Sequence, residues 1–328
     1  MQKMRPGCAS ELAHPCRVRA RVAVGQHAGM TTYTGYTAVD LSRLPSPNVV
    51  ESLSYEDLLA RMLADLVARD PSFTALVESD PAYKLLEVCA YRELLLRQRI
   101  NDAARGVMLA YAVDADLDNL GALLGVTRLT LDPGDPSRSI LPTMERDEDF
   151  RRRITLAPEG FSVAGPEGAY IFHALSASPD VLDASATSPT PGQVLVSVLS
   201  RTGDGTASQA TLAAVAARLN SATVRPLTDQ VKVQSAQIVN YTIVGTRYTF
   251  AGPDSDVVLA NSDASLLAYQ TESHRIGRDI TRSGLEAAIH VPGIQRVDLT
   301  SPAGNVVISR TQAANCTSIA LAYGGIDE

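Results

Sequence analysis

Tryptophan is absent from this chain of 328 residues, lysine occurs only three times, and aromatic residues make up only 5% of the sequence. Hydrophobic residues nevertheless reach 45%, which is enough for cores packed from aliphatic side chains and alanine. Nearly all basic charge is therefore carried by arginine, whose planar guanidinium binds carboxylates through two hydrogen bonds. This bias suits protein interfaces, and a GC-rich genome would produce it equally well.

Cysteine and histidine are scarce and scattered. The four cysteines show no CxxC spacing and the five histidines no HxxxH spacing, so neither a zinc site nor a disulfide framework is predicted. Cys89 lies on the apolar face of a predicted helix and is expected to be a small core residue. No GxSxG turn and no pair of catalytic carboxylates is visible. We therefore assign no catalytic, metal-binding or cofactor-binding residue, and no cofactor.

Long apolar runs are also missing, which excludes a transmembrane helix of the usual length, about 18 residues or more. Residues 1–29 hold five bases and one acid, a net charge of +4. Because the whole chain has a net charge of −7, residues 30–328 carry −11. An acidic body disfavours nucleic acid and anionic lipid as partners. Residues 1–29 also lack the apolar core of a signal peptide. We expect them to be a loose tail, or translation to start at Met30.

Two capping signals predict a helical region over residues 54–126. Ser54 precedes an apolar repeat at helical spacing (Leu58, Leu59, Met62, Leu63, Leu66, Val67), and Asp70-Pro71 ends it. Asp80-Pro81 opens a second helix that keeps its period to about Tyr111, a length of about 45 Å. A helix this long normally packs along another helix, and Leu86, Leu94, Ile100 and Val107 are the expected seam. A short helix is expected at 116–124.

The C-terminal half changes to a mixture of strands and helices. Strands are expected at 181–186, 194–199 and 231–233, with a helix capped by Thr206 and Gln209 between the last two. A second unit follows, with strands at 238–250 and 294–299, helices at 254–275 and 281–290, and two strands within 306–322. The predicted fold class is α+β: a long-helix bundle region followed by two small α+β domains with mixed sheets. The expected boundaries are 1–53 (extension and arm), 54–126, 127–144 (linker), 145–236 and 237–328.

The most charged segment is residues 145–153, ERDEDFRRR. Asp147, Glu148 and Asp149 each stand four residues before an arginine, so on a helix each acid is expected to pair with its base. Because these charges cancel locally, the segment is a poor phosphate-binding surface. We predict a solvated or subunit-facing helix, with Arg151, Arg152 and Arg153 as candidate interface residues.

Two short motifs could indicate a different function. DADLDN, at 114–119, resembles the start of a calcium loop, but Asn119 and Gly125 stand where that loop needs Gly and Glu. GDGTAS, at 203–208, precedes a helix but lacks the lysine of a phosphate-binding loop. Capping of a helix by acids and a strand-to-helix turn explain the two segments more simply. The alternative they leave open is a metal- or phosphate-dependent enzyme.

Five segments, in this order, resemble the baseplate J-like family of contractile-tailed bacteriophages. They are ADLDNLGALLGVTR (115–128), DEDFRRRITLAPEGFSVAGPEGAY (147–170), PGQVLVSVL (191–199), VRPLTDQVKV (224–233) and GRDITRSGLEAAIHVPGIQRVDLTSP (277–302). The resemblance extends over roughly residues 49–321, and residues 1–29 lie outside it.

The resemblance implies a structural role without catalytic residues. Family members are wedge subunits of the tail baseplate, similar in position to the wedge proteins of T-even-type phages. It implies helical bundling by 54–124 and ring contacts by 237–300, with rearrangement on contraction. The implied partners are further copies of the chain, other wedge subunits, the tail-tip or fibre-connecting protein and the central hub or spike. The implied location is the virion tail, after assembly in the host cytoplasm.

Overall fold

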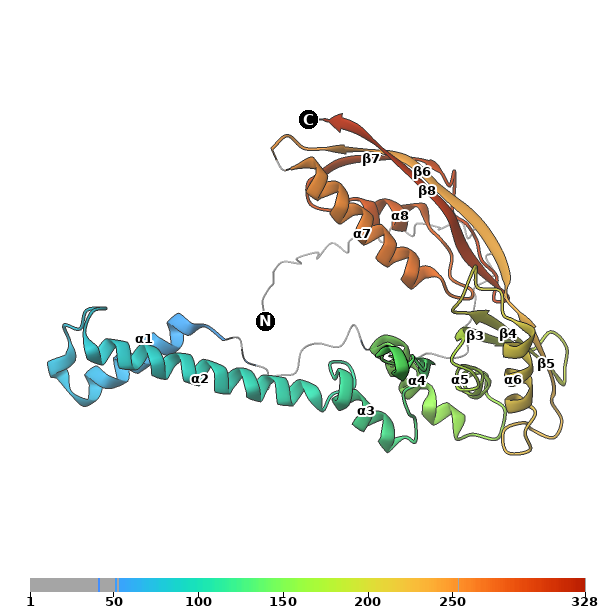
Figure 1. Ribbon diagram of the computed structural model, residues 1–328, viewed down its shortest axis with the longest axis horizontal. Coiled ribbons are helices and arrows are strands. Elements are labelled where there is room, and N and C mark those ends of the chain that lie inside the picture. Colours follow the sequence, from blue (N-terminus) through green and yellow to red (C-terminus); the bar gives the residue numbers. More distant parts are fainter. Residues whose placement is uncertain (1–40, 42–50, 52, 253, 328) are drawn as a thin grey trace, which may run out of the picture. The chain divides into compact units, whose positions relative to one another are not determined.

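The computed structural model describes residues 41, 51, 53–252 and 254–327, so the expected tail of residues 1–29 and most of the predicted arm lie outside the described part. Helices α1 (Tyr55–Arg69) and α2 (Pro81–Gly106) form an antiparallel hairpin, with the 3-10 turn η2 (Pro71–Phe73) in the connection (Figure 1). Ser54 caps α1 by accepting a hydrogen bond from the N–H of Asp57 at 3.2 Å, as predicted. The hairpin core is small and centres on Leu58, Leu59 and Ala90.

Helix α3 (Asp114–Leu123) follows, and then a short hairpin that the sequence did not predict. Strands β1 (Thr130–Asp132) and β2 (Thr143–Met144) pair antiparallel around the 3-10 turn η3 (Pro136–Arg138). The segment expected to be a plain linker therefore has its own two-stranded structure. Its return strand leads directly into the charged segment, so it fixes where the next helix begins.

The middle α+β unit contains α4 (Asp147–Gly160), α5 (Glu167–Leu175), α6 (Gln209–Leu219) and a sheet of β3 (Val181–Thr187), β4 (Gln193–Ser200) and β5 (Gln230–Ser235). The strand order is β3-β4-β5, with β3 antiparallel and β5 parallel to the central β4. Val196 and Val198 of β4 pack with Leu156, Val215 and other residues of the helices to form the largest buried cluster.

The C-terminal unit has a second mixed sheet with different connections. Strands β6 (Gln237–Thr249), β7 (Ile294–Ser301) and β8 (Gln312–Ile326) lie in the order β7-β6-β8, with β7 antiparallel and β8 parallel to β6. Helices α7 (Ser255–Ser273) and α8 (Arg282–Ile289) cover one face of this sheet (Figure 1). Ile243, Leu266, Leu285 and Ile289 form its core. A mixed sheet in each unit confirms the predicted α+β class.

Four local predictions were wrong. The long helix ends at Gly106 rather than near Tyr111, so α2 measures about 39 Å over its 26 residues. The cap of α6 is Ser208, not Thr206. The two strands expected within 306–322 are one long strand, β8. Cys89 is exposed, because no other described element covers its side of α2. None of the described helices is both long and apolar enough to cross a bilayer.

Candidate functional site

The charged segment forms a buried ion-pair network around Asp149, whose exposed fraction is 5%. Its carboxylate accepts hydrogen bonds from Arg201 at 2.6 Å and from Arg275 at 2.8 Å. Arg146 adds a weaker ion pair at 3.7 Å. Burial alone would raise the pKa of Asp149, but the two guanidinium groups outweigh it and hold the pKa below the ordinary value. One carboxylate thus joins α4, the end of β4 and the segment after α7.

A second carboxylate, Asp183 on β3, extends this network. It accepts a hydrogen bond from Arg152 at 2.7 Å and one from the backbone N–H of Ile276 at 2.9 Å. Arg275 also donates to the carbonyl of Leu182 at 2.9 Å. The residues that begin α4 therefore hold the middle and C-terminal units together inside one chain.

The predicted pairing along the helix was wrong for Asp147 with Arg151 and for Asp149 with Arg153. Arg151 donates instead to the carbonyls of Leu109 and Ala112, both at 2.7 Å. An i,i+4 pair on a solvated helix contributes only about 0.3–0.5 kcal/mol, whereas a buried carboxylate needs its charge compensated. Since α4 is largely buried, partners from other elements prevail.

Arg153 is buried within the chain, with 4% of its surface exposed. It donates to the carbonyl of Thr127 at 2.6 Å and lies 3.4 Å from the carboxylate of Glu145, which is also buried. Burial raises the pKa of Glu145 even though the Arg153 charge opposes the shift. Of the three predicted interface arginines, Arg151 and Arg152 keep intermediate exposure, while Arg153 serves the interior.

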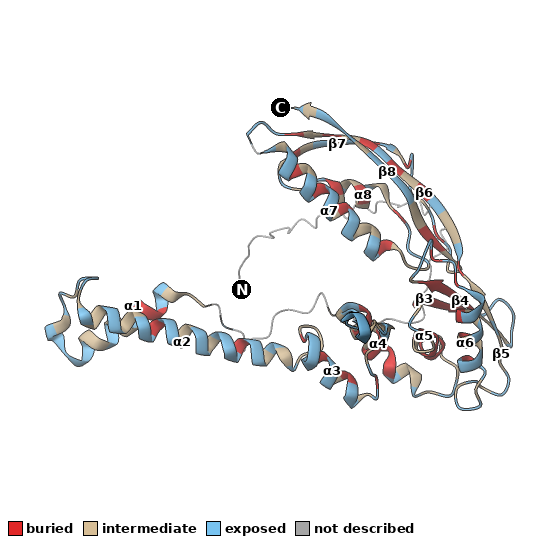
Figure 2. Ribbon diagram, in the orientation of Figure 1, coloured by how far each residue is buried: buried red, intermediate tan, exposed pale blue. Residues whose placement is uncertain are grey.

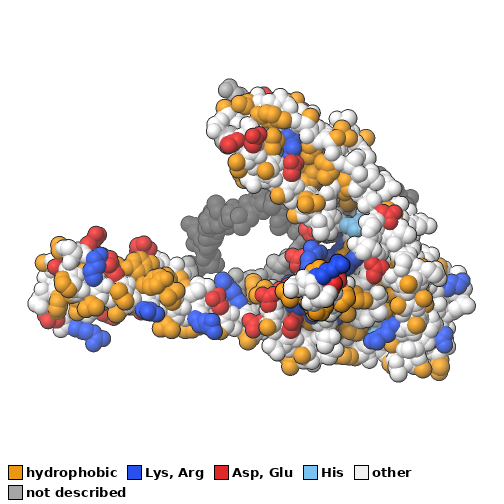
Figure 3. Space-filling view, viewed as in Figure 1, with side chains coloured by type: hydrophobic (Ala, Val, Ile, Leu, Met, Phe, Trp, Pro, Cys, Tyr) orange, Lys and Arg blue, Asp and Glu red, His pale blue; other side chains and the backbone are white. Residues whose placement is uncertain are grey.

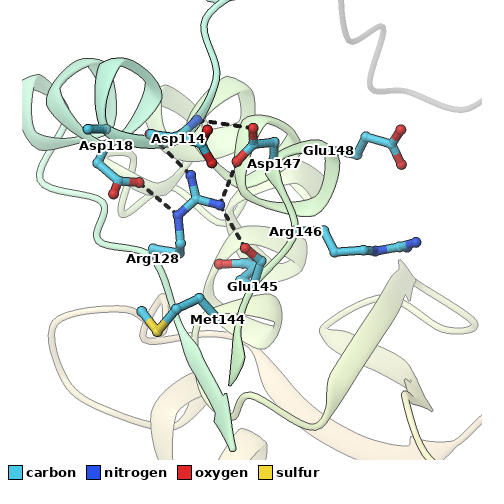
Figure 4. A pocket seen from close by; sticks show the side chains of 9 residues that line it. Asp114, Asp118, Arg128, Met144, Glu145, Arg146, Asp147 and Glu148 are labelled. Atoms are coloured by element: carbon cyan, nitrogen blue, oxygen red, sulfur yellow. Dashed lines mark hydrogen bonds and ion pairs between the residues drawn. The ribbon is translucent and has the colours of Figure 1, made fainter. Parts of the chain in front are cut away.

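Arg128 organises an open pocket of about 620 Å³ between α3 and the start of α4 (Figure 4). Its guanidinium reaches Asp118 at 2.8 Å and Asp147 at 2.7 Å, and it donates to the carbonyl of Glu145 at 2.7 Å. It also stacks over the ring of Phe150, 4.8 Å from the centroid. Sequence reasoning missed Arg128, Arg201 and Arg275, because an isolated arginine in a loop or at a strand end carries no local signal.

The DADLDN segment contributes to this pocket as a helix start. Asp114 and Asp116 lie in the first turn of α3, where acids are favoured. The N–H of Asp114 donates to Asp147 at 3.1 Å, so a residue of α4 caps α3. Asp118 is bound to Arg128 rather than turned toward a shared ion position. Over the described ranges, no group of three or more His, Cys, Asp or Glu side chains is placed to hold a metal ion.

GDGTAS forms the turn between β4 and α6. Gly203 and Gly205 adopt left-handed φ values of 67° and 97°, and a Cβ on Gly205 would lie 2.5 Å from Leu199. Asp204 accepts from the N–H of Thr206 at 2.9 Å, and Ser208 accepts from the N–H of Thr211 at 3.1 Å. The N–H donors that a phosphate would need are thus already bonded within the turn. The two glycines are explained by the backbone conformation of the turn.

The predicted seam residues of α2 fall into two groups that differ in burial. Leu86 and Leu94 pack against the α1–α2 core and are partly buried. Ile100 is 59% exposed, and Val107, just beyond the helix, is 71% exposed. The other large apolar side chains of α2 that are exposed are Leu85, Val88, Tyr91, Leu95 and Leu96. Figure 2 shows this hairpin mostly exposed, and Figure 3 shows hydrophobic side chains gathered along it.

Comparisons with known proteins agree along most of the chain. Residues 78–135 match the Baseplate J-like N-terminal domain, 162–235 the Baseplate J-like central domain and 241–322 the Baseplate J-like protein C-terminal domain. The chain is 49% identical to "Baseplate protein J" of Escherichia phage P2 over an alignment of 300 residues that covers 88% of this chain and 99% of that protein.

A solved structure gives a weaker likeness. It is titled "Cryo-EM structure of the anti-feeding prophage (AFP) baseplate, 6-fold symmetrised"; the TM-score is 0.38 at 15% identity, over 54% of this chain and 44% of that one. The chain spans less than half of that protein. The three matched domains and the near-complete alignment with a curated relative are decisive: the chain belongs to the baseplate J-like family.

Proposed function

We propose that this protein is a structural wedge subunit of a contractile tail baseplate, which links wedges into a ring around the central hub and transmits the rearrangement on contraction. The observation that carries the proposal is the ordered match of three baseplate J-like domains. Family membership makes it a structural component of the virion tail. The wedge position, the ring and the assembly in the host cytoplasm are the finer parts of the proposal.

The first proposed contact is helical bundling by residues 54–126. Within α2, apolar side chains occupy both the face toward α1 and the opposite face, and the second set is exposed. Leu96 follows Leu85 by about three helical turns and Ile100 follows Leu96 by about one, so the three form one stripe along the helix. Such a stripe is covered when a helix of another wedge subunit packs along it.

The second proposed contact is made by residues 237–300, which would join neighbouring wedges, and Arg151 and Arg152 would add polar contacts nearby. The proposed partners are further copies of this chain, other wedge subunits, the tail-tip or fibre-connecting protein and the hub or spike. A structural, non-enzymatic role fits the site chemistry. The acids of the Arg128 pocket bind an arginine, and the glycine-rich turn is closed by its own side chains.

Cryo-EM of purified tails tests the proposal directly. We expect density for this chain at the tail tip in several copies, with α2 packed against another subunit through Leu96 and Ile100. Tails that lack the chain, or a baseplate in which it occupies a single peripheral position, would refute the wedge role.

A pair of variants tests the bundling contact. Ile100→Asp should leave the purified chain folded, because Ile100 is 59% exposed, yet it should prevent incorporation into tails. Ile100→Val is the matched control, since it keeps an apolar side chain of similar shape, and it should assemble normally. Normal incorporation of Ile100→Asp would exclude this stripe as the bundling surface.

A further inference from the structure

A pocket of about 420 Å³ lies where the C-terminal end of α7, the start of β8 and the turn after β4 meet. Its polar lining consists of Arg146, Arg201, Gln270, Thr271, His274 and Asn315. None of the described residues that line it is Asp or Glu. Residues 30–328 carry a net charge of −11, so a pocket lined only by basic and neutral groups stands apart from the rest of the chain. We call it the basic pocket.

The two arginines of the basic pocket belong to a cluster with surplus positive charge. Three guanidinium groups share the carboxylate of Asp149, at distances of 2.6 Å for Arg201, 2.8 Å for Arg275 and 3.7 Å for Arg146. Three positive charges and one negative charge leave a surplus of two. The neighbouring carboxylate of Asp183 does not reduce this surplus, because Arg152 compensates it at 2.7 Å.

The acids close to the pocket in the sequence are engaged elsewhere. Asp204 accepts a backbone N–H at 2.9 Å, Glu272 forms an ion pair with Arg278 at 2.9 Å, and Glu148 lines the Arg128 pocket instead. The C-terminal end of α7 adds about half a negative charge from the helix dipole, which is less than the charge of the two lining arginines. A ligand in the pocket would therefore meet mainly positive groups.

Both lining arginines have N–H donors for a ligand. The side chain of Arg146 is 52% exposed, and Figure 4 shows it extending away from Arg128 and from the acids that bind Arg128. Arg201 uses one donor on the carbonyl of Pro179 and one on Asp149, whereas a guanidinium has five. Guanidinium groups bind carboxylates through two parallel hydrogen bonds, so an acid is the matching ligand.

The neutral polar groups of the pocket are held in place before any ligand binds. Asn315 donates one N–H of its amide to the side chain of Asn240 at 3.1 Å, and the amide carries a second N–H. The Nδ1 atom of His274 lies 2.7 Å from the carbonyl oxygen of Ala314, so it carries a hydrogen and the ring orientation is fixed. Groups that are already ordered lose little conformational entropy on binding.

The remaining wall of the pocket is apolar and includes Leu182, Tyr241 and Ala314. Tyr241 and Ala314 belong to the buried core of the C-terminal unit, with exposed fractions of 8% and 2%. A volume of 420 Å³ is far larger than the ~30 Å³ that one water occupies, and it lies in the range of sites for organic ligands. The pocket therefore suits a carboxylate that is attached to an apolar group better than a small inorganic ion.

We propose that the basic pocket binds an acidic peptide segment of another baseplate protein. A carboxylate of this segment binds Arg146 and Arg201, and a neighbouring apolar side chain lies against Leu182 and Tyr241. Nucleic acid is a worse match, because the acidic remainder of the chain would repel a long polyanion. The inference rests on the proposed baseplate role and adds the kind of partner that this part of the chain binds.

Fluorescence anisotropy with the purified full-length chain tests the pocket. The probe is a fluorescein-labelled peptide, GELEG with its C-terminus amidated, and we expect it to bind at one site per chain. The peptide GQLQG has a similar shape but lacks the two carboxylates. It should bind about tenfold more weakly, because hydrogen bonds to charged groups are stronger than those between neutral groups.

Two variants of the pocket should weaken the binding of GELEG about tenfold each. Arg146→Gln removes one guanidinium group, and Thr271→Glu places an acid at an exposed position of the lining. Arg138→Gln is the matched control, because it makes the same change in charge on the η3 turn, at a side chain that is 78% exposed, and it should leave binding unchanged. Circular dichroism checks that all three variants remain folded.

Competition with inorganic phosphate separates a peptide site from a site for free anions. Unlabelled GELEG should displace the probe at concentrations where phosphate does not. Equal displacement by phosphate would overturn the inference. So would the absence of GELEG binding, equal binding of GQLQG, or wild-type affinity in both pocket variants.

A photo-crosslinking amino acid in place of Thr271, in purified tails, identifies the occupant. It should capture a segment that contains Asp or Glu from another tail protein, whereas crosslinks confined to this chain would overturn the proposed partner. If GELEG does not bind a chain that is present in tails, only this inference is contradicted. If GELEG binds a chain that is absent from tails, only the proposed function is contradicted.

Discussion

Replacing Asp149 by asparagine should destabilise the protein more than any exposed charge change. Asp149 is 5% exposed, and its two close partners are themselves mostly buried, with side-chain exposures of 16% for Arg201 and 20% for Arg275. Asparagine has nearly the same shape as aspartate, so Asp149→Asn removes the negative charge without leaving a cavity. Two guanidinium groups then remain in the interior without a counter-charge.

The cost follows from the geometry. Removing one partner of a buried ion pair typically costs 3–5 kcal/mol, because the remaining charge is left uncompensated. Arg201 keeps its hydrogen bond to Pro179 and Arg275 keeps the one to Leu182, so we expect the lower end, about 3 kcal/mol. For a chain of this size, such a loss lowers the thermal midpoint by roughly 4 °C.

The pH dependence gives an independent check. The folded-state pKa of Asp149 lies below the ordinary value, so its contribution to the free energy of unfolding is present above pH of about 3.9. That contribution is lost as the pH falls through the folded-state pKa. The difference between wild type and Asp149→Asn should therefore be large at neutral pH and shrink in strong acid.

Urea unfolding of the purified proteins, followed by circular dichroism, measures the effect. The matched control is Asp298→Asn, whose nearest arginine is 3.7 Å away with both side chains about half exposed, so its cost should stay below about 0.5 kcal/mol. An Asp149→Asn variant within about 1 kcal/mol of wild type would refute the reasoning. So would a double-mutant cycle with Arg275→Met that showed no coupling between the two positions.

Three further predictions concern local features. Ser208→Ala should lower the free energy of unfolding by about 1 kcal/mol in urea titrations, because the cap of α6 is lost, and Thr206→Ala should cost less; the reverse order would contradict the assigned cap. Leu94→Asp should unfold the α1–α2 hairpin, seen as lost helical signal in circular dichroism, since Leu94 packs in its core; an unchanged spectrum would exclude that packing. Burial, together with the charge of Arg218, lowers the pKa of His173, so the unfolded chain binds more protons and stability should fall as the pH drops below about 6.5. A His173→Phe variant should remove part of that fall in urea midpoints measured across this pH range, and an identical pH profile would contradict the argument.

Features set by neighbouring residues could be predicted from the sequence. Ser54 caps α1 and Pro81 opens α2, because each effect depends on groups within three residues. The alternation of strands and helices also placed both sheets. Ser208 was missed in favour of Thr206 because both precede the same helix, and only the backbone shows which side chain reaches the free N–H groups.

Contacts between distant residues could not be predicted in the same way. The two close partners of Asp149 lie 52 and 126 residues away along the chain. Arg146, three residues before Asp149, forms only a weaker ion pair with it. The apolar residues within 306–322 do not show where strand pairing begins. Val306 forms only an isolated bridge with Ile280, and a single strand, β8, follows it. Helical spacing likewise could not show that Leu94 packs against the α1–α2 core while Ile100 stays 59% exposed.

Arg275 and Arg310 cover the outer edge of strand β3, and this determines which fragments of the protein can be expressed alone. Only Ala236 separates β5 from β6, and Arg275 and Arg310 are supplied from beyond that point. A fragment ending at residue 236 would leave the carbonyls of Leu182 and Ala186 unpaired and Asp149 with one close arginine instead of two. Domain-wise expression should therefore yield a poorly soluble middle fragment, and a soluble truncation series has to keep residues 145–327 as one piece.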